Sequence, residues 1–135
     1  MERRSFVKYT AAAGASLMLH PFTSFAQANP GQKIKLALVG TGARGSSLWG
    51  KAILAEFKDV CEFVGLCDIN PGRVAYVKQY MGVSCPTFTS IDDMLKGVKA
   101  DYIIVTTVDA THDEMIIKSL NAGFNVITEK PMTTD

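Results

Sequence analysis

The chain has 135 residues, of which 47% are hydrophobic and 20% are charged, which is typical of one globular domain and excludes a disordered polypeptide. The formal net charge is +1 at pH 7, so the charge balance gives no reason to expect binding to nucleic acid or to an acidic membrane surface. The three cysteines, Cys61, Cys67 and Cys85, form no C-x-x-C pair and no cluster with histidine. We interpret them as small buried hydrophobic residues and predict no metal site.

The first 28 residues have the pattern of a cleaved signal peptide. Arg3 and Arg4 precede an uncharged apolar stretch at 9–19, and residues 26–28 read Ala-Gln-Ala, as at a cleavage site. This stretch is too short to cross a membrane core of about 30 Å as a helix, so we expect no stable membrane anchor. The paired arginines resemble a twin-arginine signal, which predicts a periplasmic or otherwise exported protein. An amphipathic or unstructured tail is the alternative.

The remaining residues, 29–135, alternate between strand and helix patterns. We predict strands at 34–39, 61–67, 87–89, 101–107 and 125–128, and helices at 46–57, 71–80, 91–95 and 111–122. Asn70 and Pro71 are typical of a helix start and Gly82 of a helix end, and Ser90 is expected to cap the third helix. Right-handed crossovers between such strands predict an α/β fold with a doubly wound parallel sheet.

A glycine-rich turn directly follows the first predicted strand. Residues 40–45 read Gly-Thr-Gly-Ala-Arg-Gly and lead into the helix at 46–57. In a dinucleotide site Gly40 would allow the tight turn, Gly42 the approach of the pyrophosphate, and Gly45 the close packing of helix on strand. We therefore predict that Gly40, Thr41, Gly42, Ala43, Arg44 and Gly45 bind a dinucleotide, with a purely structural turn as the alternative. In the helix, Leu48, Ala52 and Ala55 are expected to face inward.

An acidic residue ends the second predicted strand at the position that favours NAD. Asp68 lies 23 positions after Gly45, where a dinucleotide fold places the carboxylate that accepts hydrogen bonds from the adenosine ribose. A carboxylate there repels a 2′-phosphate, so NAD is expected over NADP. Arg44 and Arg73 complicate this preference, because either side chain could reach a 2′-phosphate. A loop aspartate that caps the next helix is the alternative for Asp68.

Two further segments follow strands at the edge of the sheet where ligands bind in such folds, and we predict that Thr106, Thr107, His112, Glu129 and Lys130 contact the cofactor. Thr106 and Thr107 end the fourth strand and His112 begins the next helix, where a lone histidine is usually structural. Glu129 and Lys130 follow the fifth strand. The lysine can donate to a substrate hydroxyl or to the nicotinamide side of a cofactor, with Glu129 orienting it. The bond from Lys130 to the following proline is a candidate for the cis form.

These motifs in this order resemble the glucose–fructose oxidoreductase/inositol dehydrogenase/MocA family (Gfo/Idh/MocA) over about residues 33–135. The resemblance rests on four segments, at 39–45, 67–70, 106–112 and 126–131. It implies an NAD(P)-binding Rossmann fold that binds a dinucleotide and belongs to an oxidoreductase. Such an enzyme transfers a hydride between the nicotinamide and a sugar, a cyclitol or a derivative. The resemblance also implies that Lys130 contacts cofactor and substrate as the catalytic residue.

The resemblance leaves two other functional hypotheses. Members of the family continue into a second domain that binds the sugar and helps to form oligomers, whereas this sequence stops at Asp135. A C-terminal substrate domain is thus expected to be absent, and the chain would then be a non-catalytic NAD-binding fragment. Some exported relatives use bound NAD to act as glycosidases, so the chain could also be the cofactor half of such an enzyme. A homo-oligomer is compatible with each hypothesis.

Overall fold

The computed structural model describes residues 31–131, and the predicted signal peptide at 1–28 lies outside these residues. None of the helices in the described range combines the length and the apolar character needed to cross a membrane. The strands are β1 (Ile34–Val39), β2 (Cys61–Cys67), β3 (Thr87–Phe88), β4 (Tyr102–Val105) and β5 (Asn125–Thr128). The helical segments are η1 (Gly45–Ala52), α2 (Ile53–Phe57), α3 (Pro71–Met81), α4 (Ile91–Gly97), η2 (Asp109–Thr111) and α5 (His112–Asn121).

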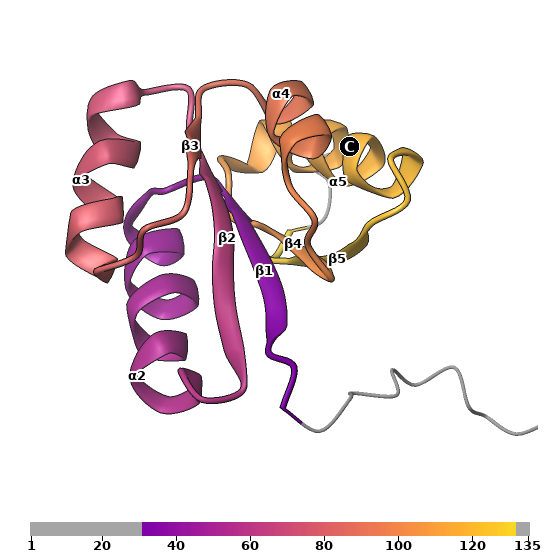
Figure 1. Ribbon diagram of the computed structural model, residues 1–135. Helices are drawn as coiled ribbons and strands as arrows, with labels where there is room; N and C mark the ends of the chain where they lie inside the picture. Colours follow the sequence, from indigo (N-terminus) through magenta and orange to yellow (C-terminus); the bar gives the residue numbers. More distant parts are fainter. Residues whose placement is uncertain (1–30, 132–135) are drawn as a thin grey trace, which may run out of the picture. The chain divides into compact units, whose positions relative to one another are not determined.

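The five strands form one parallel sheet in the order β3-β2-β1-β4-β5. Helices α2 and α3 cover one face of the sheet, and α4 and α5 cover the other (Figure 1). The chain moves outward from β1 through β2 to β3, then returns to the centre and continues through β4 to β5. This arrangement confirms the predicted doubly wound Rossmann sheet, and it makes the boundary between β1 and β4 the point at which the strand order reverses.

Side chains of β1 alternate between two hydrophobic cores. Leu36 and Leu38 join the core under α2 and α3, whereas Ala37 and Val39 join the core under α4 and α5. In β4, Ile104 joins the first core and its two neighbours join the second. Both faces of these central strands are buried, which explains why their sequences are continuously apolar instead of alternating with polar residues.

The helix after the glycine turn differs from the prediction in the face that it buries. Its first part, η1, is a π-helix, whose i→i+5 hydrogen bonds place more residues in each turn than an α-helix does. Leu48, Ala52 and Ala55 are exposed, so their predicted inward orientation is wrong. Trp49, Ile53 and Leu54 pack against the core instead.

Other boundaries agree with the prediction to within two residues. Asn70 caps α3 by accepting a hydrogen bond from the backbone N–H of Arg73 at 3.0 Å, and Gly82 ends this helix with φ of 71°. Ser90 occupies the cap position of α4, but its side chain makes no capping hydrogen bond. The strand predicted at 101–107 is shorter and ends at Val105, and the two threonines that follow line a cleft.

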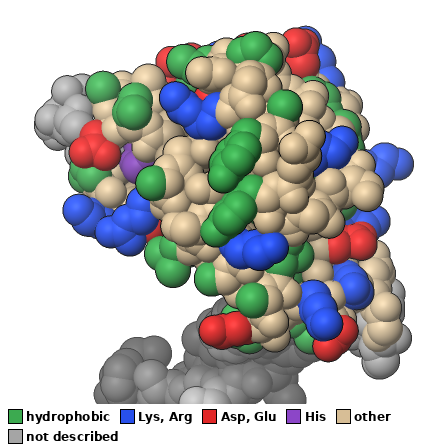
Figure 2. Space-filling view, turned by 90° about the vertical axis from the view of Figure 1, so that its left-hand side faces the viewer, with side chains coloured by type: hydrophobic (Ala, Val, Ile, Leu, Met, Phe, Trp, Pro, Cys, Tyr) green, Lys and Arg blue, Asp and Glu red, His purple; other side chains and the backbone are tan. Residues whose placement is uncertain are grey.

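The surface over α2 and α3 carries separate hydrophobic patches among basic side chains (Figure 2). Tyr76 and Tyr80 stack with their ring centroids 6.2 Å apart, and the ammonium group of Lys51 lies 5.5 Å from the centroid of Tyr80. Aromatic stacking and a cation over a ring face stabilise such exposed rings locally.

Candidate dinucleotide site

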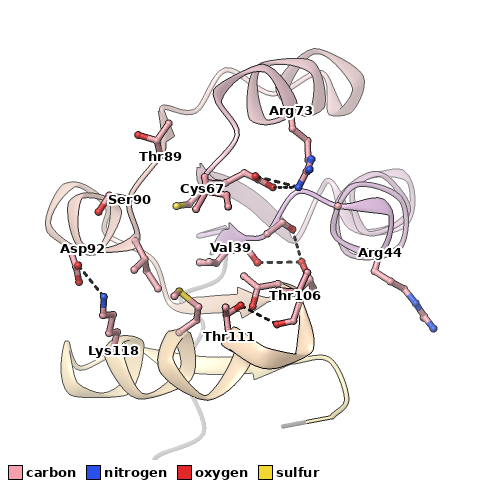
Figure 3. Close-up of a pocket in the computed structure, with 18 of the residues that line it drawn as sticks. Val39, Arg44, Cys67, Arg73, Thr89, Ser90, Asp92, Thr106, Thr111 and Lys118 are labelled. Atoms are coloured by element: carbon pink, nitrogen blue, oxygen red, sulfur yellow. Dashed lines mark hydrogen bonds and ion pairs between the residues drawn. The ribbon is translucent and has the colours of Figure 1, made fainter. Parts of the chain in front are cut away.

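A cleft of about 550 Å³ opens at the carboxyl ends of the central strands, where the strand order reverses. In an open α/β sheet this is the position at which ligands bind. Figure 3 shows its walls, which come from the glycine turn, from the segments after β2, β3 and β4, and from α5. The lining includes Gly40, Gly42, Ala43, Arg44, Asp68, Arg73, Thr106 and Thr107, all predicted from the sequence to contact the cofactor.

The glycine turn is held in a conformation that other residues would disrupt. Gly40 has φ of +90°, a value that side-chain-bearing residues rarely adopt, and its N–H donates to the carbonyl of Cys67 at 2.8 Å. A Cβ atom on Gly45 would collide with the carbonyl oxygen of Gly40 and would lie 2.6 Å from the Thr106 hydroxyl. Close packing of the helix against the strand therefore requires glycine at position 45, in agreement with the predicted role.

Gly42 differs from these two glycines because it lies beside open space. A Cβ atom built at this position would meet no atom within 4 Å, and Gly42 lines the cleft. Packing within the protein therefore does not require glycine at this position. The absence of a side chain would instead allow a phosphate to approach the backbone closely. The first N–H groups of the following helix have no partner within that helix, so they are suited to bind an anion.

Asp68 lies at the end of β2 and fixes the glycine turn from the side. Its Oδ2 accepts hydrogen bonds from the backbone N–H and the hydroxyl of Thr41, both at 2.9 Å. Its Oδ1 accepts from the backbone N–H of Asn70 at 2.9 Å, and the Arg73 guanidinium lies 3.3 Å from Oδ2. Thr41, predicted to contact cofactor, is 1% exposed and absent from the cleft lining, so it acts by holding the turn.

The environment of Asp68 favours its charged form. Burial raises the pKa of its carboxyl group, but hydrogen bonds from Asn70 and Thr41 and the positive charge of Arg73 outweigh burial and hold the pKa below its usual value. A buried carboxylate therefore stands at the cleft in its ionised form at neutral pH.

The two threonines after β4 have different roles. The Thr106 hydroxyl donates to the carbonyl oxygen of Gly40 at 2.6 Å, so it supports the turn. The Thr107 hydroxyl is buried and has no hydrogen-bond partner within the described residues. Because buried polar groups are nearly always paired, the Thr107 hydroxyl is a candidate ligand contact.

A second, smaller cavity of about 170 Å³ lies between the ends of β4 and β5. It brings together His112, Glu129 and Lys130, which are separated by up to 18 positions in the sequence, with Thr107 and Arg44 shared with the larger cleft. His112 is 1% exposed, and its Nδ1 lies 2.7 Å from the carbonyl oxygen of Pro131. A carbonyl oxygen only accepts, so Nδ1 carries the hydrogen and His112 holds the turn that contains Lys130. The Lys130–Pro131 bond is cis.

Glu129 is held by a residue that the sequence analysis missed. Its Oε1 accepts a hydrogen bond from the indole N–H of Trp49 at 2.9 Å and lies 3.6 Å from the Arg44 guanidinium. The Trp49 hydrogen bond is the main cause that lowers the pKa of Glu129, with Arg44 and Lys130 acting in the same direction. Glu129 thus links η1 to the turn after β5. The expected pairing of its side chain with Lys130 is replaced by the bond from Trp49.

The residues at the far end of the cleft were also not predicted from the sequence. Thr89, Ser90 and Asp92 line it from the start of α4, and Lys118 from α5 donates to Asp92 at 3.1 Å (Figure 3). These residues form no recognisable sequence motif, because they are brought together only when α4 and α5 pack on the same face of the sheet.

Cys67 lines the cleft but is expected to be chemically inert. Burial, with smaller contributions from the negative charges of Asp68 and Asp93, raises the pKa of its thiol to about 11. The nucleophilic thiolate is therefore scarce at neutral pH. We expect no alkylation of Cys67 by iodoacetamide in the native protein at pH 7.5, and complete alkylation after unfolding, as measured by peptide mass spectrometry. Rapid labelling of the native protein would contradict this assignment.

Comparisons with known proteins agree with this geometry. Residues 34–135 match an oxidoreductase family described by its NAD-binding Rossmann fold. The chain is 32% identical to a glycosyl hydrolase family 109 protein of Stenotrophomonas maltophilia, covering 93% of this chain and 29% of that protein. It is 29% identical to inositol 2-dehydrogenase 3 of Saccharopolyspora erythraea, covering 76% and 29% of the two chains.

A solved structure extends the agreement to three dimensions. The WlbA dehydrogenase from Chromobacterium violaceum, crystallised with NADH and UDP-GlcNAcA, is 35% identical, with a TM-score of 0.70 over 76% of this chain and 29% of that one. The chain thus spans less than a third of the length of these relatives. The matched family and the geometry of the cleft together establish that the chain belongs to the Gfo/Idh/MocA oxidoreductase family, within its NAD-binding Rossmann fold.

Proposed function

We propose that residues 29–135 bind NAD as the cofactor-binding part of an oxidoreductase that acts on sugars, cyclitols or their derivatives. The observation that carries this proposal is the open space beside Gly42, in a cleft at the switch point of a parallel sheet. A dinucleotide fits there, because the glycine turn exposes backbone to a pyrophosphate and Asp68 presents a carboxylate near the ribose position. The relatives named above include an inositol dehydrogenase and a dehydrogenase crystallised with NADH.

In this proposal each part of the cleft has a separate task. The backbone near Gly42 and Ala43 binds the pyrophosphate, and the Thr107 hydroxyl contacts the cofactor. When bound, NAD supplies the carbon that accepts or releases a hydride. Lys130 lines the smaller cavity and is exposed, so its ammonium group can donate a hydrogen bond to the oxygen of a substrate hydroxyl or carbonyl. His112 and Glu129 hold the turn that carries this lysine.

The test uses the single tryptophan of the chain, Trp49, which contacts Glu129 at the edge of the smaller cavity. Bound NADH is expected to quench Trp49 emission and to gain emission of its own by energy transfer, with saturation at a concentration below about 1 mM. AMP lacks the nicotinamide and serves as the control, because it should compete with NADH without accepting energy. Failure of NADH to saturate would refute the proposed function.

An assay of sugar oxidation distinguishes the hypothesis of an oxidoreductase from that of a non-catalytic NAD-binding fragment. We would incubate the chain with NAD⁺ and a panel of sugars and cyclitols, and follow the absorbance of NADH. Sugar-dependent reduction would support an oxidoreductase complete within these residues. Binding of NAD without turnover would instead support a cofactor-binding part that needs further residues for the substrate.

An NAD-dependent glycosidase is the second candidate, supported by the glycosyl hydrolase family 109 relative, whose match covers 93% of this chain. Such an enzyme would release an aryl group from a glycoside without net reduction of NAD⁺. An assay with nitrophenyl glycosides and bound NAD, performed on that relative and on this chain, distinguishes the two candidates.

We also propose that residues 1–28 direct export. Support comes from the sequence pattern around Arg3 and Arg4. The intact mass of the exported protein is expected to correspond to a chain that begins near Asn29. Retention of Met1 in the exported fraction would overturn this proposal.

A further inference from the structure

We propose that Arg73 competes with the adenosine ribose for the Asp68 carboxylate and thereby sets the preference between NAD and NADP. The inference rests on the proposed function, because it assigns a role to one residue at the ribose end of the same cleft. It concerns selectivity between two cofactors, and it adds the effect of Arg73 to the preference for NAD that Asp68 alone predicts.

The Asp68 carboxylate has no spare capacity in this structure. Two carboxylate oxygens offer about four acceptor positions. Four donor groups already use them: the N–H and the hydroxyl of Thr41, the N–H of Asn70, and the guanidinium of Arg73. The Asp68 side chain is 4% exposed. Ribose hydroxyls can therefore bind Asp68 only after one of these donors has left.

Arg73 is the donor that can leave. Its Nη1 lies 3.4 and 3.3 Å from the two carboxylate oxygens, whereas the other three donor groups lie at 2.9 Å. The other donors belong to a 1%-exposed threonine and to a backbone N–H fixed at the start of α3, but the Arg73 side chain is 50% exposed. Figure 3 shows Arg73 reaching down from α3 to the carboxylate at the edge of the cleft.

The two cofactors make opposite demands on this ion pair. The 2′-hydroxyl of NAD needs a free acceptor on Asp68, so binding of NAD must displace the guanidinium and loses its attraction to the carboxylate. The 2′-phosphate of NADP provides a second anion at the same place, so Arg73 can turn from the carboxylate to the phosphate and bind it with charge-assisted hydrogen bonds. Arg73 thus disfavours NAD and favours NADP, which opposes the effect of Asp68 alone.

The experiment compares binding of NAD⁺ and NADP⁺ to the full 135-residue chain by calorimetry. In Arg73→Ala, NAD⁺ is expected to bind about two- to fivefold more tightly, as for release of a partly exposed ion pair. NADP⁺ is expected to bind about tenfold more weakly or worse, because a charged hydrogen bond is lost. Arg73→Gln, which keeps a donor without charge, should lie between Arg73→Ala and the unmodified chain in the ratio of the two affinities.

Lys99→Ala is the matched control, because it removes one positive charge from an exposed position that does not line the cleft. It should leave the ratio of the two affinities unchanged. Weaker binding of NAD⁺ to both Arg73 variants, in chains whose thermal unfolding is unchanged, would overturn the competition. An equal loss of affinity for both dinucleotides would overturn it as well. Failure of the unmodified chain to bind either dinucleotide would instead refute the proposed function and this inference with it.

Discussion

Gly45→Ala is expected to destabilise the protein severely, whereas Gly42→Ala is expected to change its stability little and to weaken NAD binding. A methyl group at position 45 meets the backbone of Gly40 and the hydroxyl of Thr106. Backbone atoms cannot move aside as easily as the end of a flexible side chain. We therefore expect the free energy of unfolding, measured by urea denaturation, to fall by about 3 kcal/mol or more. Such a loss is a large part of the stability of a typical domain.

At position 42 a methyl group has open space on the protein side. We expect the free energy of unfolding of Gly42→Ala to change by less than about 1 kcal/mol. The methyl group would occupy the place proposed for the pyrophosphate, so the affinity for NAD⁺ should fall about tenfold or more in calorimetry. Because the two variants add the same atom three residues apart, each is the control for the other. Unchanged NAD⁺ affinity in Gly42→Ala would show that the cleft does not hold a pyrophosphate at this turn.

Asp68→Asn is expected to destabilise the protein and to remove part of its sensitivity to acid. The carboxylate accepts from Thr41, Asn70 and Arg73, whereas an amide presents donors on one side and leaves one of these buried groups unpaired. Such a change typically costs about 1–3 kcal/mol at neutral pH. The glycine turn would lose its lateral support, so NAD⁺ affinity should also fall.

The sign of the acid effect follows from the lowered pKa of Asp68. The folded state binds this proton less readily than the unfolded state does, so the contribution of Asp68 is fully present above the unfolded pKa of about 3.9 and is lost as the pH falls through the folded value. Unfolding free energies of the original chain and of Asp68→Asn should therefore converge as the pH is lowered below about 4. A difference that stays constant down to pH 2 would contradict the assigned pKa direction. Asp113→Asn, on the exposed side of α5, is a charge-matched control.

Local chemistry explains why much of the fold was predictable. Asn70, Pro71 and Gly82 act within one turn of the helix ends that they specify, so their identity alone indicates where α3 begins and ends. The continuous apolar sequence of β4 reflects burial on both faces. The prediction failed at Leu48, because the buried face of this helix runs through Gly45 and Gly50, which pack closely against neighbouring segments and have no apolar side chain to mark that face in the sequence.

By itself, the sequence determined the order of strands and helices along the chain, the glycine turn and the polar residues that follow the central strands. These features depend on residues that are close in the chain, where backbone preference and hydrophobic periodicity act directly. Tertiary structure alone decided that Trp49 holds Glu129, that His112 holds the turn with Lys130, and that Thr41 donates to the carboxylate of Asp68. Such pairings depend on which crossovers bring distant segments to one edge of the sheet, and the direction of each side chain is set by packing that no local pattern encodes.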